Sequence, residues 1–130
     1  MNGIKIEAEF TMKTFAGFYT YCKADEHIWD DFRDVENVEK AVAYVKKILT
    51  NKNARDIMVT FIYDNGTDYG CSTSRLCDDF SGGIREYAWD EYGNNIRNIQ
   101  HKKLSAKHIK ELYLDCADKA IEYKKERGIA

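Results

Sequence analysis

The stretch Ile57-Met58-Val59-Thr60-Phe61-Ile62-Tyr63, followed by Asp64-Asn65-Gly66-Thr67, is the part of the sequence that decides the fold. A short run of apolar, aromatic and β-branched residues that ends at turn residues is typical of a buried strand. Asn-Gly is the preferred central pair of a two-residue type I′ hairpin, because both positions need a positive φ. We therefore predict a hairpin around Asn65-Gly66. In that register the pairs are Ile62 with Tyr69, Thr60 with Cys71, and Met58 with Thr73.

Two further strands are predicted near the N-terminus. Residues 4–12 alternate strictly between apolar and polar side chains, which is the period of a strand with one buried and one wet face. The apolar set is Ile4, Ile6, Ala8, Phe10 and Met12. Residues 18–23 are rich in β-forming residues and are predicted to pair antiparallel to this strand.

Two longer segments have the period of an amphipathic helix. From Val35 to about residue 51, apolar residues recur at steps of three and four, and Asp34 is the expected N-cap. Residues 105–127 show the same period, with Ser105 as the N-cap. The apolar stripe of this last helix is Ile109, Leu112, Tyr113, Cys116, Ala120 and Tyr123. Residues 84–92, which Gly93 follows, are predicted to form a third, short helix.

The expected fold is therefore α+β, in the order β-β-α-β-β-α-α. About four antiparallel strands would be packed by two main helices and one short helix. A chain of 130 residues without a proline or a Gly/Ser linker predicts a single globular domain over residues 1–130. No apolar run approaches the ~20 residues that a membrane helix needs, and the N-terminus lacks the apolar core of a signal peptide. We expect a cytoplasmic protein.

No catalytic or metal-binding motif is recognisable. The four cysteines lack C-x₂-C spacing, and the three histidines (His27, His101 and His108) lack the register of metal ligands. Neighbouring carboxylates point to opposite faces of a strand and lie ~100° apart on a helix, so acid pairs are poor preformed chelates. We expect no catalytic residue, no metal and no cofactor.

Three short stretches join carboxylates to aromatic residues: Trp29-Asp30-Asp31-Phe32, Asp78-Asp79-Phe80 and Trp89-Asp90-Glu91-Tyr92. Trp and Tyr are favoured anchors at binding surfaces, and neighbouring carboxylates suit a basic partner. These residues are our predicted partner-binding residues. The alternative for each tryptophan is that it closes the edge of the core.

The charge distribution bears on the class of partner. Residues 1–40 carry nine acidic and five basic residues, whereas residues 96–130 carry five acidic and nine basic ones. A simple nucleic-acid binder should be dominated by basic residues, which this chain is not. The favoured hypothesis is a non-enzymatic inhibitor or regulator that occupies a basic surface of a partner protein, such as a nucleic-acid-binding effector. In type the chain resembles accessory proteins of phages and mobile elements, including anti-CRISPR and other anti-defence inhibitors, but the resemblance transfers no site residue.

Two alternatives remain open. One is a nucleic-acid or nucleotide-binding module that uses basic residues near the last helix together with Tyr19 and Tyr21. Those basic residues are Arg97, Lys102, Lys103, Lys107 and Lys110. The other is a small metal-dependent enzyme that uses the clustered carboxylates.

Overall fold

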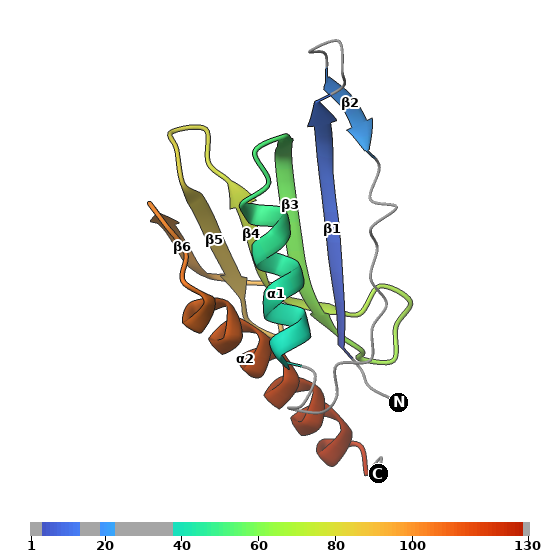
Figure 1. Cartoon of the computed structure of the whole chain (residues 1–130). Helices are drawn as coiled ribbons and strands as arrows, with labels where there is room; N and C mark the ends of the chain where they lie inside the picture. The colour runs from blue at the N-terminus through green and yellow to red at the C-terminus, as the bar shows by residue number, and fades with distance from the viewer. Residues whose placement is uncertain (1–3, 14–18, 23–37, 129–130) are drawn as a thin grey trace.

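The computed structural model describes residues 4–13, 19–22 and 38–128. In chain order the elements are β1 (Ile4–Lys13), β2 (Tyr19–Cys22), α1 (Val38–Leu49), β3 (Ala54–Tyr63), β4 (Cys71–Asp78), β5 (Ile84–Trp89), β6 (Asn95–His101) and α2 (Ala106–Glu126). The strands form one antiparallel sheet in the order β2-β1-β3-β4-β5-β6, and both helices pack on the same face of it (Figure 1). The α+β class is confirmed, with six strands in the sheet where about four were expected.

The described part of the chain contains no helix that is both long and apolar enough to cross a membrane.

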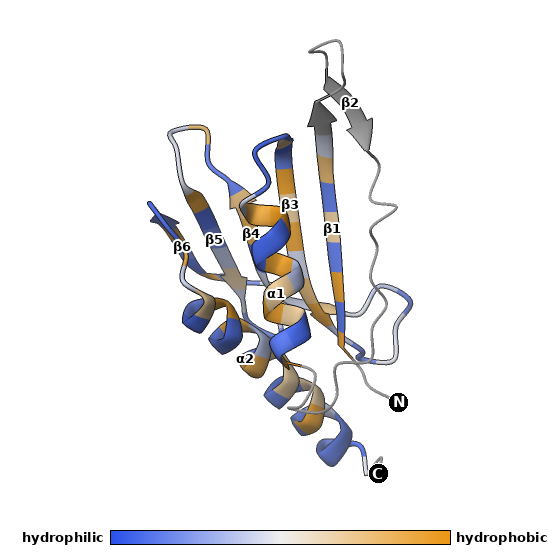
Figure 2. Cartoon of the chain, viewed as in Figure 1, coloured by the Kyte–Doolittle hydropathy of each residue, from blue (hydrophilic) through white to orange (hydrophobic). Residues whose placement is uncertain are grey.

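The strands β1 and β3 supply the sheet side of the core. β1 pairs with β3 so that Ile6 lies opposite Phe61 and Ala8 opposite Val59, and all four side chains are fully buried. Hydrophobic and hydrophilic residues alternate along β1, as its period of two predicts (Figure 2). β2 pairs antiparallel with the other edge of β1, so the expected pairing of the first two strands is also confirmed.

The helices supply the other side of the core. α1 buries Val38, Ala41, Val45 and Ile48, which are spaced as the helical period requires. α2 has the predicted boundaries: Ser105 is its N-cap, and Ser105 Oγ accepts a hydrogen bond from the His108 backbone N–H at 3.1 Å. The predicted stripe of α2 is buried from Ile109 to Ala120, with Tyr123 half-buried at its end. The expected N-cap of α1, Asp34, lies outside the described residues.

The predicted register of the β3–β4 hairpin is wrong. Tyr63 pairs with Cys71 and Met58 with Cys77, so residues 64–70 form a wide loop rather than a two-residue turn. Asp64 Oδ1 accepts the Gly66 N–H at 2.8 Å, and Asn65 Oδ1 accepts the Thr67 N–H at 3.2 Å. These side-chain hydrogen bonds stabilise local turns within the loop. In these turns Gly66 has a positive φ and Asn65 does not. A type I′ turn would need a positive φ at both residues.

The predicted short helix over residues 84–92 is also wrong, because this segment forms β5 and the start of the following turn. Ile84, Glu86 and Ala88 share the face that meets the helices, since Glu86 and Ala88 are buried and pair across from Leu76 and Ser74. Because the central inward-facing residue, Glu86, is charged, hydrophobicity does not show the period of two along this strand. The next segment forms β6, an edge strand whose residues 95–100 are all exposed, so no apolar pattern marks it.

Candidate functional site

A cavity of about 500 Å³ lies between the turn that follows β5 and the C-terminal half of α2. We refer to it as the tyrosine cavity, because its wall includes Tyr63, Tyr92 and Tyr123. Its charged wall residues are Asp90, Glu91, Glu122, Glu126, Lys119 and Arg127. Four carboxylates thus face two basic groups, and the cavity carries a net negative charge.

The positions of these side chains follow from the elements that bear them. Residues three and four apart on a helix lie on one face, so Lys119, Glu122, Tyr123 and Glu126 point to the same side of α2. The Tyr123 hydroxyl donates a hydrogen bond to the Asn65 carbonyl oxygen at 2.7 Å, which ties the end of α2 to the β3–β4 loop. The ring centroids of Tyr63 and Tyr123 are 6.4 Å apart with a tilt of 53°, so the back wall is aromatic.

Asp90 organises the turn between β5 and β6. Its Oδ1 accepts the backbone N–H groups of Tyr92 and Asn94 at 2.9 Å each, and its Oδ2 accepts the Asn94 amide at 3.1 Å. These hydrogen bonds, led by those from Asn94, lower the pKa of Asp90, so it stays ionised. With Asp90 holding the turn, its neighbours Glu91 and Tyr92 project outward, and the Tyr92 side chain is 82% exposed.

The cationic residues of the cavity already have partners within the chain. Lys119 Nζ lies 3.8 Å from Asp115 Oδ2. The Arg127 guanidinium carbon lies 4.8 Å from the centre of the Tyr123 ring, which is the distance of a cation–π contact. The charge of Glu91 raises the pKa of Tyr92, and burial raises the pKa of Tyr63, so both phenols are neutral at physiological pH. The cavity is therefore built of neutral aromatic rings and carboxylates, a combination that suits a cation.

The predicted partner-binding residues are not gathered in one place. Asp90, Glu91 and Tyr92 line the tyrosine cavity, but Trp89 points to the opposite face of the sheet. There its ring stacks with Tyr87 at 6.3 Å, and the Arg75 guanidinium lies 5.3 Å from the ring centre. The stretch Trp29-Asp30-Asp31-Phe32 lies outside the described residues.

The stretch Asp78-Asp79-Phe80 lies at the other end of β5, where Asp78 is the last residue of β4 and the other two residues begin the turn that joins β4 to β5. Its carboxylates are used within the chain: Asp78 Oδ2 accepts the Asp56 N–H at 3.0 Å, and Asp79 Oδ2 accepts the Arg85 Nε–H at 3.0 Å. Phe80 is fully exposed at the tip of the turn. The strand β5 therefore separates this stretch from the tyrosine cavity.

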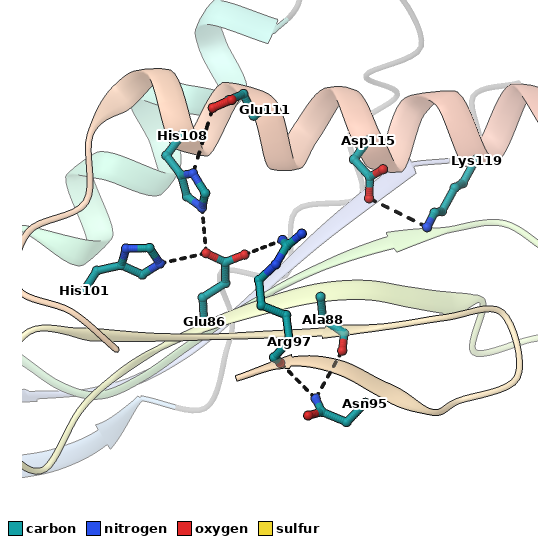
Figure 3. A network of polar contacts seen from close by, with 9 residues as sticks. All are labelled: Glu86, Ala88, Asn95, Arg97, His101, His108, Glu111, Asp115 and Lys119. Carbon is teal, nitrogen blue, oxygen red and sulfur yellow. Dashed lines mark hydrogen bonds and ion pairs between the residues drawn. The ribbon is translucent and has the colours of Figure 1, made fainter. Parts of the chain in front are cut away.

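A second candidate site surrounds Glu86, whose side chain is completely buried. Glu86 Oε1 lies 2.8 Å from His101 Nε2 and 2.6 Å from His108 Nε2, while Glu86 Oε2 accepts a hydrogen bond from Arg97 at 2.7 Å. Figure 3 shows the three partners pointing at the carboxylate from different sides. We refer to these four residues as the Glu86 cluster.

Three elements build the Glu86 cluster. Glu86 faces the helices from the middle of β5, His101 ends β6, and His108 lies in the first turn of α2. Burial alone would raise the pKa of Glu86, but the hydrogen bonds from Arg97, His108 and His101 outweigh burial and lower it. Glu86 is therefore an ionised buried carboxylate whose lone pairs are well satisfied. The carboxylate and both imidazoles each offer a ligand atom within 4.8 Å of the others, so these three residues could hold a metal ion.

Sequence reasoning missed the Glu86 cluster. The sequence pattern predicts a helix at Glu86, the spacing of the histidines indicates no metal site, and Arg97 is named only among the basic residues of the nucleic-acid-binding alternative. The sequence separations of these residues match no short motif, because strand pairing and the start of α2 bring them together. The available signal was the pair of histidines on either side of the Ser105 cap.

The chain matches no protein-family model, no curated protein and no solved structure.

Proposed function

We propose that this chain is a non-enzymatic, cytoplasmic binding protein that receives a basic side chain of a partner protein in the tyrosine cavity. The observation that carries the proposal is the composition of the cavity wall, in which three tyrosines and four carboxylates surround a space of about 500 Å³. A space of that size accommodates an arginine or lysine side chain together with its neighbours.

The contact between Arg127 and Tyr123 supports an arginine as the guest. A guanidinium already lies on one tyrosine ring of the cavity at 4.8 Å, so the site is compatible with this group sterically and electrostatically. Arg127 is exposed at the end of α2, so its side chain can move off the Tyr123 ring and leave room for an arginine of the partner. A guest arginine could also reach Glu122 or Glu126, and a planar guanidinium binds carboxylates through two parallel hydrogen bonds.

The partner class that we favour is a nucleic-acid-binding effector with a basic groove. Carboxylates in such a groove take the place of phosphates, so the protein would act as an inhibitor or regulator by competition. This is the mode of action expected from the resemblance in type to anti-CRISPR and other anti-defence proteins. Charge complementarity of this kind mainly determines specificity and the rate of association.

Charge reversal at one cavity residue tests the proposal. The immobilised chain is used to capture partners from a nuclease-treated bacterial lysate, and the binding of the captured protein is then measured with two variants. Glu122→Lys changes a carboxylate of the cavity wall, whereas Asp118→Lys makes the same change one turn away on α2, at an exposed residue outside the wall. We expect Glu122→Lys to weaken binding at least tenfold, about 1.4 kcal/mol, and Asp118→Lys to weaken it less than threefold.

Two results would contradict the proposal. One is equal weakening by the two variants, which would mean that overall charge, not the cavity, decides binding. The other is a captured protein without a basic surface. Tyr92→Ala adds a test that does not change charge, and we expect it to weaken binding as well, because Tyr92 is an exposed aromatic group at the cavity mouth.

A further inference from the structure

We propose that Glu86, His101 and His108 form a binding site for a divalent transition-metal ion, and that Zn²⁺ is the ion that suits it. The ligand atoms are Glu86 Oε1, His101 Nε2 and His108 Nε2, which lie within 4.8 Å of one another. This site is separate from the tyrosine cavity, and none of its residues lines that cavity.

The ligand types select the class of metal. Two imidazole nitrogens and one carboxylate oxygen form a ligand set used by open zinc sites, in which three protein groups bind the ion and water takes the fourth position. Mg²⁺ and Ca²⁺ prefer all-oxygen sites, so the two imidazoles disfavour them. Among divalent ions, Zn²⁺ binds a nitrogen–oxygen site more tightly than Mn²⁺ or Fe²⁺ does.

The side chains must move by about 1 Å to admit the ion. With zinc–ligand bonds of about 2.0–2.1 Å, the ligand atoms of a tetrahedral site lie roughly 3.4 Å apart. Glu86 Oε1 is now 2.8 Å from His101 Nε2 and 2.6 Å from His108 Nε2, so each imidazole must withdraw from it by less than 1 Å. The two Nε2 atoms lie within 4.8 Å of each other, so they must approach by no more than about 1.4 Å. Both rings can do so, because the His101 and His108 side chains are 23% and 31% exposed. The same exposure gives the ion and its water a path from solvent.

The surroundings of the ligands are those of a metal site. Arg97 binds Glu86 Oε2 at 2.7 Å and thereby fixes the carboxylate with Oε1 directed at both histidines. Glu111 Oε1 lies 3.9 Å from His108 Nδ1, on the side of the ring away from Glu86, which is too far for a hydrogen bond but places a negative charge where it favours a protonated Nδ1. The charge of Arg97 opposes a second cation, so we expect weaker binding than at a closed structural zinc site.

Metal titration of the wild-type chain tests the proposal. We expect ZnCl₂ to bind with one equivalent per chain and to raise the melting temperature, and MgCl₂ to do neither. Free cysteines are a competing zinc site, since Cys71 and Cys77 are partly exposed. Co²⁺ distinguishes the two, because binding at the Glu86 cluster gives visible absorption without a thiolate charge-transfer band.

Single substitutions locate the site. His101→Ala and His108→Ala should each weaken Zn²⁺ binding at least tenfold, whereas Lys107→Ala, at an exposed neighbour of His108 on α2, should leave it unchanged. The proposal is overturned if zinc does not bind, or if both histidine variants bind it as the wild type does.

A measurement on the wild type covers the case in which a histidine variant does not fold. In a chain with ¹⁵N-labelled histidine, Zn²⁺ should shift the Nε2 resonances of two of the three histidines and leave their Nδ1 atoms protonated. Shifts at a single histidine, or at none, would contradict the site.

Discussion

Glu86 shows how one buried charge can decide local structure. Its side chain faces the helices from β5, at a position where an apolar residue is usual. Burial of its charge is tolerated because three side chains form hydrogen bonds or ion pairs with the carboxylate. Arg97, His101 and His108 are all partly exposed, so only the carboxylate is withdrawn from water. A pattern based on hydrophobicity could not anticipate this arrangement, because the partners come from other elements.

The residues Trp89 and Tyr92 belong to the same four-residue stretch but have different surroundings. Trp89 is half-buried between Tyr87 and Arg75, on the sheet face away from the helices. Tyr92 is 82% exposed at the mouth of the tyrosine cavity. Because side chains alternate along a strand, Trp89 points to the sheet face opposite to that of its neighbour Ala88. The turn that follows then brings Tyr92 back to the side of α2.

Alanine substitutions should separate these two roles. We expect Trp89→Ala to lower the free energy of unfolding by about 1–2 kcal/mol, because it removes the aromatic stack with Tyr87 and the cation–π contact with Arg75. Tyr92→Ala is the control and should change that free energy by less than ~0.5 kcal/mol, as at other exposed positions. Urea denaturation measures both. Equal stability of the two variants would show that the stack on Trp89 contributes nothing.

At the level of elements, periodicity was reliable where the core face was apolar. β1 and α2 were both predicted from their spacing, and Ser105 was correctly placed as the cap of α2. β6 has no buried face to give a pattern, since it lies at the edge of the sheet. The register of the β3–β4 hairpin was missed because Asp64 and Asn65 use their side chains to hold the loop, a preference that competes with the Asn-Gly turn.

The β4–β5 hairpin offers a test of close backbone packing. Gly82 and Gly83 both have a positive φ, so a side chain at either position is strained. A Cβ atom at Gly83 would also overlap the His101 carbonyl oxygen, whereas one at Gly82 would meet nothing within 4 Å. We expect Gly83→Ala to cost about 1–3 kcal/mol more than Gly82→Ala, because the end of β6 must move.

Denaturation midpoints of the two glycine variants measure this difference, provided that the slopes with urea are alike. Backbone strain affects both substitutions and is greater at Gly82, whose φ of 105° is further from the left-handed region than the 75° of Gly83, so strain opposes the expected difference and does not produce it. If the two free energies of unfolding differ by less than ~0.5 kcal/mol, the end of β6 moves without a measurable loss of stability, and the backbone at His101 is not rigidly fixed.

At the scale of the whole molecule, the two candidate sites lie at opposite ends of α2. His108 is in its first turn, and Glu122 is fourteen residues further along, or roughly 21 Å at 1.5 Å per residue. α2 is anchored to the sheet between them by buried residues such as Leu112 and Cys116. The sequence predicted this helix and its apolar stripe, but it could not show which loops meet its two ends.

The position of each strand in the sheet predicts how the molecule opens. β3 lies in the interior of the sheet and carries Phe61, which is fully buried, whereas β6 is an edge strand with residues 95–100 exposed. Amides in β3 should exchange with solvent only when the whole molecule unfolds, and amides in β6 should exchange through a local opening of lower free energy. A core substitution should therefore affect the two strands differently.

Phe61→Leu keeps an apolar group in the core and should lower the global stability by about 1 kcal/mol. Native-state hydrogen exchange should then show the opening free energy of β3 amides falling by that amount, as should that of amides in the middle of α2, which pack on the same core. The β6 amides should not change, because their local opening leaves Phe61 buried. Ile121→Ala, at a side chain that is 57% exposed on α2, is the control and should shift none of them by more than ~0.5 kcal/mol. If β6 instead loses as much as β3, the sheet opens as a single unit, and the edge strand that bears Arg97 and His101 is as stable as the core.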